Sequence, residues 1–251
     1  RIHKDKIMYT LNDVKLKSKK GSNDESHKRL YFFASHFSIY FSWVFINLRL
    51  SADFVTGIFF ATGLLGAVLF LYGDPLISLI AYGLWRLHII FDLCDGEVAR
   101  FTQKFSINGA YWDYMIHSLL YPLVYVSICI ALYGKFNDTI FLIVGLFGSI
   151  VVSQTLSVKN NYYRAMLFNG EKIDNNRSAN KASALKAYSV NIFTSLLNFE
   201  GLLLVYLILS LTVILKEAYL IVFLLYTASF LLQALIKFIL FSKKGFYTRR
   251  S

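Results

Sequence analysis

Six long apolar segments restrict the possible folds of this chain more than any other feature. They run over residues 53–73, 76–99, 107–133, 139–158, 192–215 and 218–242. Each is about as long as the ~20 residues that an α-helix needs to cross a bilayer. Lipid cannot satisfy backbone hydrogen bonds, so spans of this kind must be helical. The sequence therefore predicts an all-α integral membrane protein with six transmembrane helices.

Composition and charge agree with a membrane protein. Hydrophobic residues make up 56% of the chain and charged residues only 16%, which is unusual for a soluble domain. The net charge of +11 comes from basic residues beside the apolar segments, as expected of cytoplasmic flanks, so no nucleic-acid partner is predicted. Cys94 and Cys129 lie within apolar segments, and neither a disulfide nor a zinc site is expected from their spacing.

The distribution of Lys and Arg predicts the orientation. If both termini are cytoplasmic, all but three of the 26 basic residues fall on inner loops, tails or the segment before the first span. The exceptions are Arg86, Lys135 and Lys216. This asymmetry favours a multi-pass protein with cytoplasmic N and C termini. The connection between the second and third spans would then face the cytoplasm.

Residues 29–50 are aromatic but interrupted by polar side chains such as Ser38, Ser42 and Asn47. They could form a further span or an amphipathic helix in the membrane interface, and the interleaved polar residues favour the interface. We therefore expect a basic cytoplasmic segment with an interfacial helix over 1–50. A six-helix transmembrane catalytic domain over 51–242 and a basic cytoplasmic tail over 243–251 follow, with membrane lipids as partners.

A cluster of acidic residues surrounds the second connection. Asp92 and Asp95 are three residues apart, and Asp113 and His117 are four apart, so each pair shares a helix face. A turn containing Gly109 would bring the two faces together. Converging carboxylates repel one another unless a cation neutralises them, and oxygen ligands suit Mg²⁺ or Mn²⁺. Two such ions sharing the cluster would suit phosphoryl transfer.

The alternative is that these acids are ordinary charges at a helix end. That reading is adopted for Glu97 and Lys104. It is weaker for the aspartates, because carboxylates at a membrane edge are functional candidates. Beside them, Gly96 would leave room for a substrate, and Arg100 could pair with phosphate oxygens.

Residues 92–117 resemble the signature of the CDP-alcohol phosphotransferase family, D-x2-D-G-x2-A-R-x8-G-x3-D-x3-D. They read "DLCDGEVAR", then eight further residues, then "GAYWDYMIH". The residues that match are Asp92, Asp95, Gly96, Ala99, Arg100, Gly109 and Asp113. Such a long, gapped motif is specific. Six spans and a preceding interfacial helix are also similar to this family. The resemblance implies a homodimer that transfers a substituted phosphate from a CDP-linked donor to an alcohol or lipid acceptor and releases CMP.

The resemblance also assigns roles to residues. The metal ligands would be Asp92, Asp95, Asp113 and His117, with Asp113 and His117 catalytic. The donor would be contacted by Gly96, Ala99, Arg100, Ser106, Gly109 and Thr56. In the family the first span tends to open with a Pro-Asn-x-x-Thr-like stretch, whereas "ADFVT" keeps only Thr56 here.

His117 departs from the signature, which has aspartate at this position. His117 could still be the general base, since an imidazole titrates near neutrality, and could ligate a metal with a shift toward Mn²⁺ or Zn²⁺. Alternatively, the acceptor could be already ionised, such as a lipid phosphate. In a third reading the site has lost its activity, and the chain is a membrane scaffold of the same fold. We take the base as the working hypothesis.

The substrates stay open at this point. CDP-diacylglycerol could donate a phosphatidyl group to a small alcohol, or a soluble CDP-linked head group could be passed to a lipid. The motif addresses the CDP portion that both arrangements share. A transporter is the competing class, but it should show interrupted helices or a repeat, and neither is evident.

Overall fold

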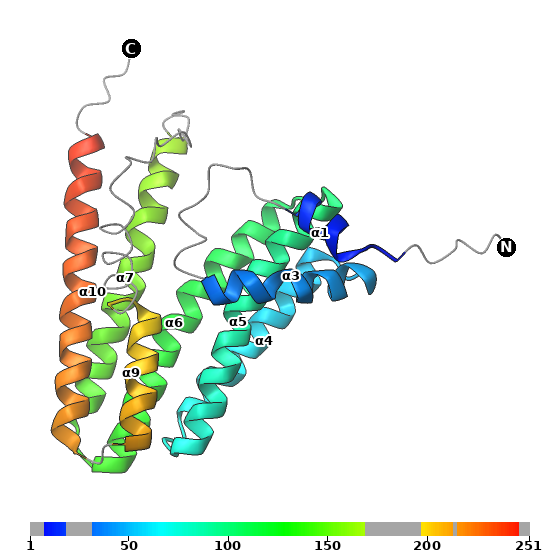
Figure 1. The fold of residues 1–251 in the computed structure, drawn as a ribbon. Helices are drawn as coiled ribbons and strands as arrows, with labels where there is room; N and C mark the ends of the chain where they lie inside the picture. Colours follow the sequence, from blue (N-terminus) through cyan, green and yellow to red (C-terminus); the bar gives the residue numbers. More distant parts are fainter. Residues whose placement is uncertain (1–7, 19–31, 169–196, 213–214, 246–251) are drawn as a thin grey trace, which may run out of the picture. The chain divides into compact units, whose positions relative to one another are not determined.

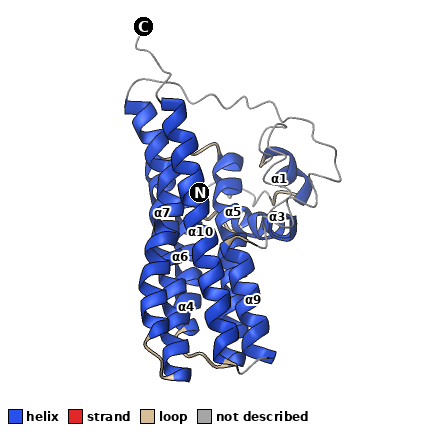
Figure 2. Ribbon diagram, turned by 90° about the vertical axis from the view of Figure 1, so that its left-hand side faces the viewer, coloured by secondary structure: helices blue, strands red, loops and turns tan. Residues whose placement is uncertain are grey.

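The computed structural model describes residues 8–18, 32–168, 197–212 and 215–245. Secondary structure within these ranges is entirely helical (Figure 2). The helices labelled in Figure 1 are α1 (Leu11–Lys17), α3 (Phe32–Asn47), α4 (Ala52–Phe70), α5 (Pro75–Thr102), α6 (Ile107–Phe136), α7 (Ile140–Phe168), α9 (Phe199–Thr212) and α10 (Lys216–Gly245).

Five of the described helices are long and apolar enough to cross a membrane: α4, α5, α6, α7 and residues Lys216–Ser242 of α10. They correspond to five of the six predicted spans and are consistent with a multi-pass membrane protein. The remaining predicted span, 192–215, contains α9, whose 14 residues extend about 21 Å against a hydrocarbon core of about 30 Å. Residues 192–196 and 213–214 lie outside the described residues, so this span stays a prediction.

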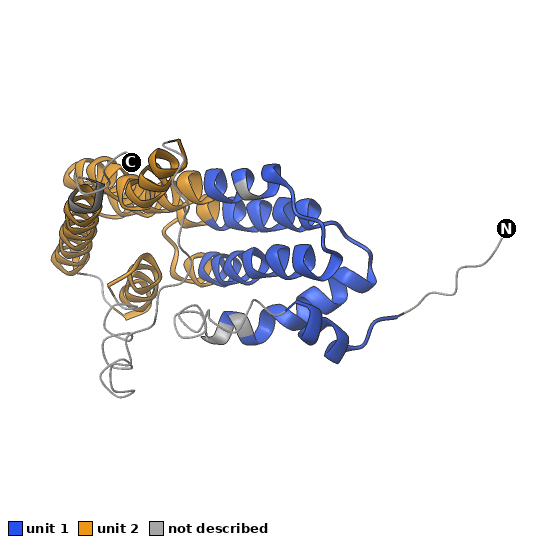
Figure 3. Ribbon diagram, turned by 90° about the horizontal axis from the view of Figure 1, so that it is seen from above, with its two compact units in different colours: residues 1–66, 80–116 blue, residues 67–79, 117–251 orange. Residues whose placement is uncertain are grey.

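The chain divides into two compact units, coloured in Figure 3. Unit 1 comprises Arg1–Gly66 and Ile80–Ile116, and unit 2 comprises Ala67–Leu79 and His117–Ser251. Helix α6 runs unbroken through the boundary between Ile116 and His117. Of the predicted segment 1–50, the described residues 8–18 and 32–50 are grouped in unit 1 with parts of α4, α5 and α6, whereas residues 1–7 and 19–31 lie outside the described residues.

Within unit 1, helix α1 begins at a capping box. The Thr10 hydroxyl accepts from the backbone N–H of Asp13, while the Asp13 carboxylate accepts from the backbone of Thr10. The Thr10 hydroxyl also donates to the Asp13 carboxylate at 2.7 Å, and this bond, together with the one from the Thr10 backbone N–H, lowers the pKa of Asp13 below its usual value. Helix α1 then packs on α3, where Trp43 donates its indole N–H to the carbonyl oxygen of Tyr9 at 2.8 Å.

Helix α3 buries the polar residues that interrupt its aromatic sequence. Ser38 and Ser42 are fully buried, whereas Phe37, Tyr40 and Val44 are exposed. The two hydroxyls donate to the carboxylate of Glu97 on α5, at 2.8 Å from Ser38 and 2.6 Å from Ser42. The serines that suggested a polar face for this helix therefore point inward. The exposed apolar face still suits the membrane interface, which stays a prediction.

Within unit 2, small residues allow α6 and α7 to approach closely. A Cβ on Gly145 would lie 2.7 Å from the Cβ of Cys129, and one on Gly148 would collide with the ring of Tyr125. The Tyr125 hydroxyl hydrogen-bonds with Thr227 of α10 at 2.6 Å. Helix α10 packs in turn against α7 and α9. Glycine contacts of this kind are typical of helices that pack within membranes.

Candidate active site

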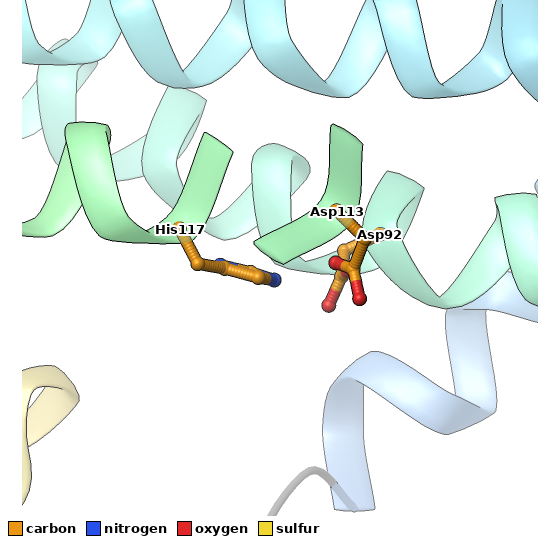
Figure 4. Close-up of side chains that lie close together, drawn as sticks. All are labelled: Asp92, Asp113 and His117. Carbon is orange, nitrogen blue, oxygen red and sulfur yellow. The ribbon is translucent and has the colours of Figure 1, made fainter. Parts of the chain in front are cut away.

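Asp92 of α5 and Asp113 and His117 of α6 converge on one point (Figure 4). One ligand atom from each of the three side chains lies within 4.8 Å of the others, and all three residues are partly buried. In Figure 4 the imidazole of His117 points toward the two carboxylates. The cluster combines one residue from the first half of the motif with two from the second.

The helical spacing of the motif explains this convergence. Asp113 and His117 are four residues apart on a continuous helix, so they share a face whichever unit each residue is assigned to. Asp92 and Asp113 both belong to unit 1. The ring of Tyr121 packs edge-on against His117 at 5.5 Å between centroids, one turn further along α6. That contact supports the orientation of the imidazole.

Asp95 was expected among the metal ligands but is not part of this cluster of described residues. Its Oδ2 instead accepts a hydrogen bond of 3.0 Å from the hydroxyl of Thr56 on α4. The same hydroxyl lies 3.1 Å from the carbonyl oxygen of Ala52. Thr56, expected to contact the donor, therefore also joins α4 to the acidic helix face of α5.

A cleft of about 1400 Å³ opens within unit 1. It is larger than the ~300–1,000 Å³ of usual small-molecule pockets. The predicted site residues that line it are Thr56, Asp95, Gly96, Ala99, Ser106, Gly109 and Asp113. Of the predicted donor contacts, Arg100 does not line the cleft. The cleft thus brings together residues that are far apart in the sequence.

Ser106 fixes the start of α6 at the edge of the cleft. Its hydroxyl accepts from the backbone N–H of Gly109 at 2.8 Å, the bond expected of a residue that caps a helix N terminus. The hydroxyl also donates to Oδ1 of Asp53 at 3.3 Å. A Cβ on Gly109 would lie 3.1 Å from the hydroxyl oxygen of Ser106. Asp53 is a cleft carboxylate that sequence reasoning noted only as a substitution in "ADFVT".

The motif arginine fills space beside the motif glycine. A Cβ on Gly96 would lie 3.0 Å from Nη1 of Arg100, one turn along α5. The Nε–H of Arg100 donates to the carbonyl oxygen of Ser18 at 2.8 Å. The room expected beside Gly96 is thus partly taken by the guanidinium group. Contact between Arg100 and phosphate stays a prediction.

Sequence reasoning missed two sets of residues. Glu97, interpreted as an ordinary charge, is the acceptor that joins α5 to α3. The N-terminal side of the cleft was also missed, and its wall includes Tyr9, Lys17 and Arg49. The capping box at Thr10 and Asp13 could have revealed α1. Nothing local in the sequence reveals that this helix lies along the cleft.

The donor set of the cluster fits a divalent cation. Two carboxylates suit Mg²⁺ or Mn²⁺, and one imidazole shifts the preference toward Mn²⁺. Asp92, Asp113 and His117 together could hold one ion. A second ion would need Asp95, which lines the cleft with Asp113.

No family model matches the chain. The chain is 32% identical over 118 residues to a bifunctional IPC transferase and DIPP synthase from Archaeoglobus fulgidus, and the match covers 44% of the chain. That relative is a transferase. The matched region spans only 23% of the archaeal transferase. The similarity to this transferase therefore supports transferase chemistry at a coarse level.

Proposed function

We propose that this chain is a membrane-embedded phosphotransferase that moves a substituted phosphate group from a CDP-linked donor to an acceptor hydroxyl and releases CMP. The observation that supports the proposal is the convergence of Asp92, Asp113 and His117, which stand at three of the four aspartate positions of the signature. The similarity to the archaeal transferase adds support. The acceptor is an alcohol, either small and polar or on a lipid.

In the proposed reaction the acceptor oxygen forms a bond to the donor phosphorus, and the bond between that phosphorus and the CMP oxygen breaks. CMP leaves with the electron pair of the broken bond. A divalent ion, when bound, supplies charge neutralisation for the diphosphate. Asp92 and Asp113 would hold that ion.

His117 has the remaining role in this mechanism. Its neutral imidazole accepts the proton that the acceptor hydroxyl loses as the new bond forms. Asp113, one turn earlier on α6, stabilises the imidazolium that results, because opposite charges attract strongly in a partly buried site. The residue that replaces the usual aspartate of the signature therefore keeps the function of a base.

The cleft residues bind the donor in this proposal. Ser106 and Gly109 sit at the start of α6, where N–H groups favour a phosphate. Thr56 and Gly96 line the same cleft. The active site faces the cytoplasm in the proposed orientation, and the protein is proposed to be a homodimer.

The test is CMP release by the purified full chain in nanodiscs. CDP-diacylglycerol and a soluble CDP-linked alcohol serve as donors, each with small alcohols, diacylglycerol or phosphatidic acid as acceptors and with Mg²⁺ or Mn²⁺. We expect metal-dependent release that Asp92→Asn reduces at least 100-fold. Asp138→Asn, which changes a carboxylate in the loop before α7, is the matched control and should not reduce it. Absence of metal-dependent release with every pair from folded protein would contradict the proposal and favour a scaffold.

A further inference from the structure

Three basic side chains line the cleft from three separate segments. Lys17 ends α1, Arg49 follows α3, and Lys104 lies in the turn between α5 and α6. All three are exposed. Asp95 and Asp113 line the same cleft. The cleft therefore carries basic as well as acidic side chains, although the three basic residues are not clustered in the sequence. The part of its lining that holds Lys17, Arg49 and Lys104 is called the basic wall.

Arg49 occupies a backbone position that favours glycine. Its φ is +59°, in the left-handed region. The N–H of Arg49 donates to the carbonyl of Ile46 at 2.9 Å, and the N–H of Leu50 donates to that of Phe45 at 3.0 Å. This pair of hydrogen bonds is the Schellman motif, in which the left-handed residue is usually glycine because a Cβ is strained there. Arginine at this position costs stability, so its side chain needs another explanation.

Lys17 is held in place by aromatic rings of the same wall. Its ammonium nitrogen lies 5.4 Å from the ring centroid of Phe101 and 5.9 Å from that of Tyr9. Both rings belong to residues that line the cleft, and they pack edge-on at 4.9 Å between centroids. A cation over aromatic faces is attracted to them and loses part of its mobility. The basic wall is thus partly ordered by its own contacts.

We infer that Arg49, with Lys17 and Lys104, binds a phosphate group of a ligand in the cleft. A guanidinium group matches phosphate oxygens with two parallel N–H donors, and flanking ammonium groups add charge. The phosphate belongs to the CDP-linked donor or to a phosphorylated acceptor. This assignment rests on the proposed function for its choice of ligands. No position of the phosphotransferase signature includes these three residues.

The left-handed backbone of Arg49 makes the inference testable. Arg49→Gly removes the guanidinium and the backbone strain together. If Arg49 binds phosphate, this variant should lose affinity without losing stability, whereas a structural role for the side chain predicts a loss of stability. The unfolding temperature should stay the same or rise by about 2–4 °C. Affinity for the phosphate should fall. Asn137→Gly is the matched control, because Asn137 also has a left-handed φ of +49° but lies after α6 in unit 2.

The experiment measures binding of CDP, and separately of glycerol 3-phosphate, to the full chain in phosphatidylcholine nanodiscs by calorimetry. We expect Arg49→Gly to weaken one or both affinities about 10- to 100-fold, as loss of a charged hydrogen bond does. Arg49→Lys should recover part of the loss. A loss with CDP alone assigns the wall to the donor, and a loss with glycerol 3-phosphate alone assigns it to the acceptor.

The inference is overturned if wild type binds neither probe, if Arg49→Gly binds both unchanged, or if Asn137→Gly weakens binding equally. CMP release, measured on the same samples, separates this result from the proposed function. Weaker CDP binding by Arg49→Gly without any CMP release in wild type keeps the phosphate site and rejects the reaction. Normal CMP release by Arg49→Gly, with an unchanged affinity for both probes and an unchanged KM, rejects the phosphate site and keeps the proposed reaction.

Discussion

The hydroxyl of Ser42 on α3 donates a hydrogen bond of 2.6 Å to Oε2 of Glu97 on α5. Ser38, one turn earlier, donates to Oε1 of the same carboxylate at 2.8 Å. Glu97 lies two residues after Asp95, on the helix that carries the first half of the motif. These two bonds therefore fix the position of α3 against the helix of the proposed active site.

Replacing Glu97 tests this connection between α3 and α5. Glu97→Ala leaves two buried hydroxyls without their acceptor, which costs about 1–3 kcal/mol in the free energy of unfolding. Glu97→Gln should lose less, because an amide oxygen still accepts. Thermal unfolding in detergent provides the measurement, and Glu217→Ala, at an exposed position of α10, is the control. Equal unfolding temperatures for Glu97→Ala and Glu217→Ala would contradict a structural role for Glu97.

His117 variants test the assignment of the base. His117→Ala should lower turnover by about 10²- to 10⁴-fold, the usual contribution of a general base. His117→Asp should retain more activity than alanine, because a carboxylate can also accept the proton. The measurements are turnover against pH and against each metal. His36→Ala, on the exposed side of α3, is the control. Unchanged turnover in His117→Ala would show that another group accepts the proton.

The close contact of α6 with α7 predicts opposite effects for two glycine substitutions. Gly148→Ala places a methyl group against the ring of Tyr125, which is held by its bond to Thr227. Overpacking of this kind costs about 1–3 kcal/mol in the free energy of unfolding. Gly134→Ala, where a Cβ meets nothing within 4 Å, should be neutral or stabilising by up to about 1 kcal/mol. Thermal unfolding compares the two, and the contact is refuted if Gly148 accepts alanine as readily as Gly134.

Asp138 predicts a small acid-side dependence of stability. The N–H of Ile140, at 3.0 Å, and the ammonium of Lys216, also at 3.0 Å, both donate to this carboxylate and lower its pKa below the usual 3.8. A lowered pKa stabilises the fold above pH 3.8, and the contribution disappears as the pH falls through the lower folded value. As the pH falls below 3.8, the unfolding temperature should therefore fall less steeply in Asp138→Asn than in wild type. The difference will be small, since exposed ion pairs contribute little to stability. Identical profiles of unfolding temperature against pH in wild type and Asp138→Asn would exclude a contribution from this carboxylate.

The sequence predicted what depends on helical spacing. Asp113 and His117 share a face because four residues make about one turn, and Asp92 meets them as expected. Asp95, also predicted from spacing, is placed by something else: the hydroxyl of Thr56 from another helix holds its Oδ2. Spacing along one helix could not show which of two acids a third helix would engage.

The periodicity of polar and apolar residues does not predict contacts between segments that are far apart in the sequence. The serines of α3 were interpreted as a polar face because periodicity shows polarity but not the partner that the polar group finds. Their partner, Glu97, lies 59 residues from Ser38 and 55 from Ser42. Arg49 was missed for a related reason, since its left-handed backbone follows from the hydrogen bonds of the turn rather than from its residue type.

The cleft wall formed by Tyr9, Lys17, Ile46, Arg49 and Leu50 has a practical consequence for anyone who shortens this chain. A truncated protein beginning at Ser51 would keep every acidic residue of the motif and the five described helices that are long enough to cross a membrane. It would nevertheless lack one side of the cleft, and Glu97 would lose both serine donors. Such a protein could insert and bind a metal while failing to retain a substrate. Expression trials that remove the basic N-terminal segment as a dispensable leader would then test the proposed function on a protein that has lost one side of its cleft.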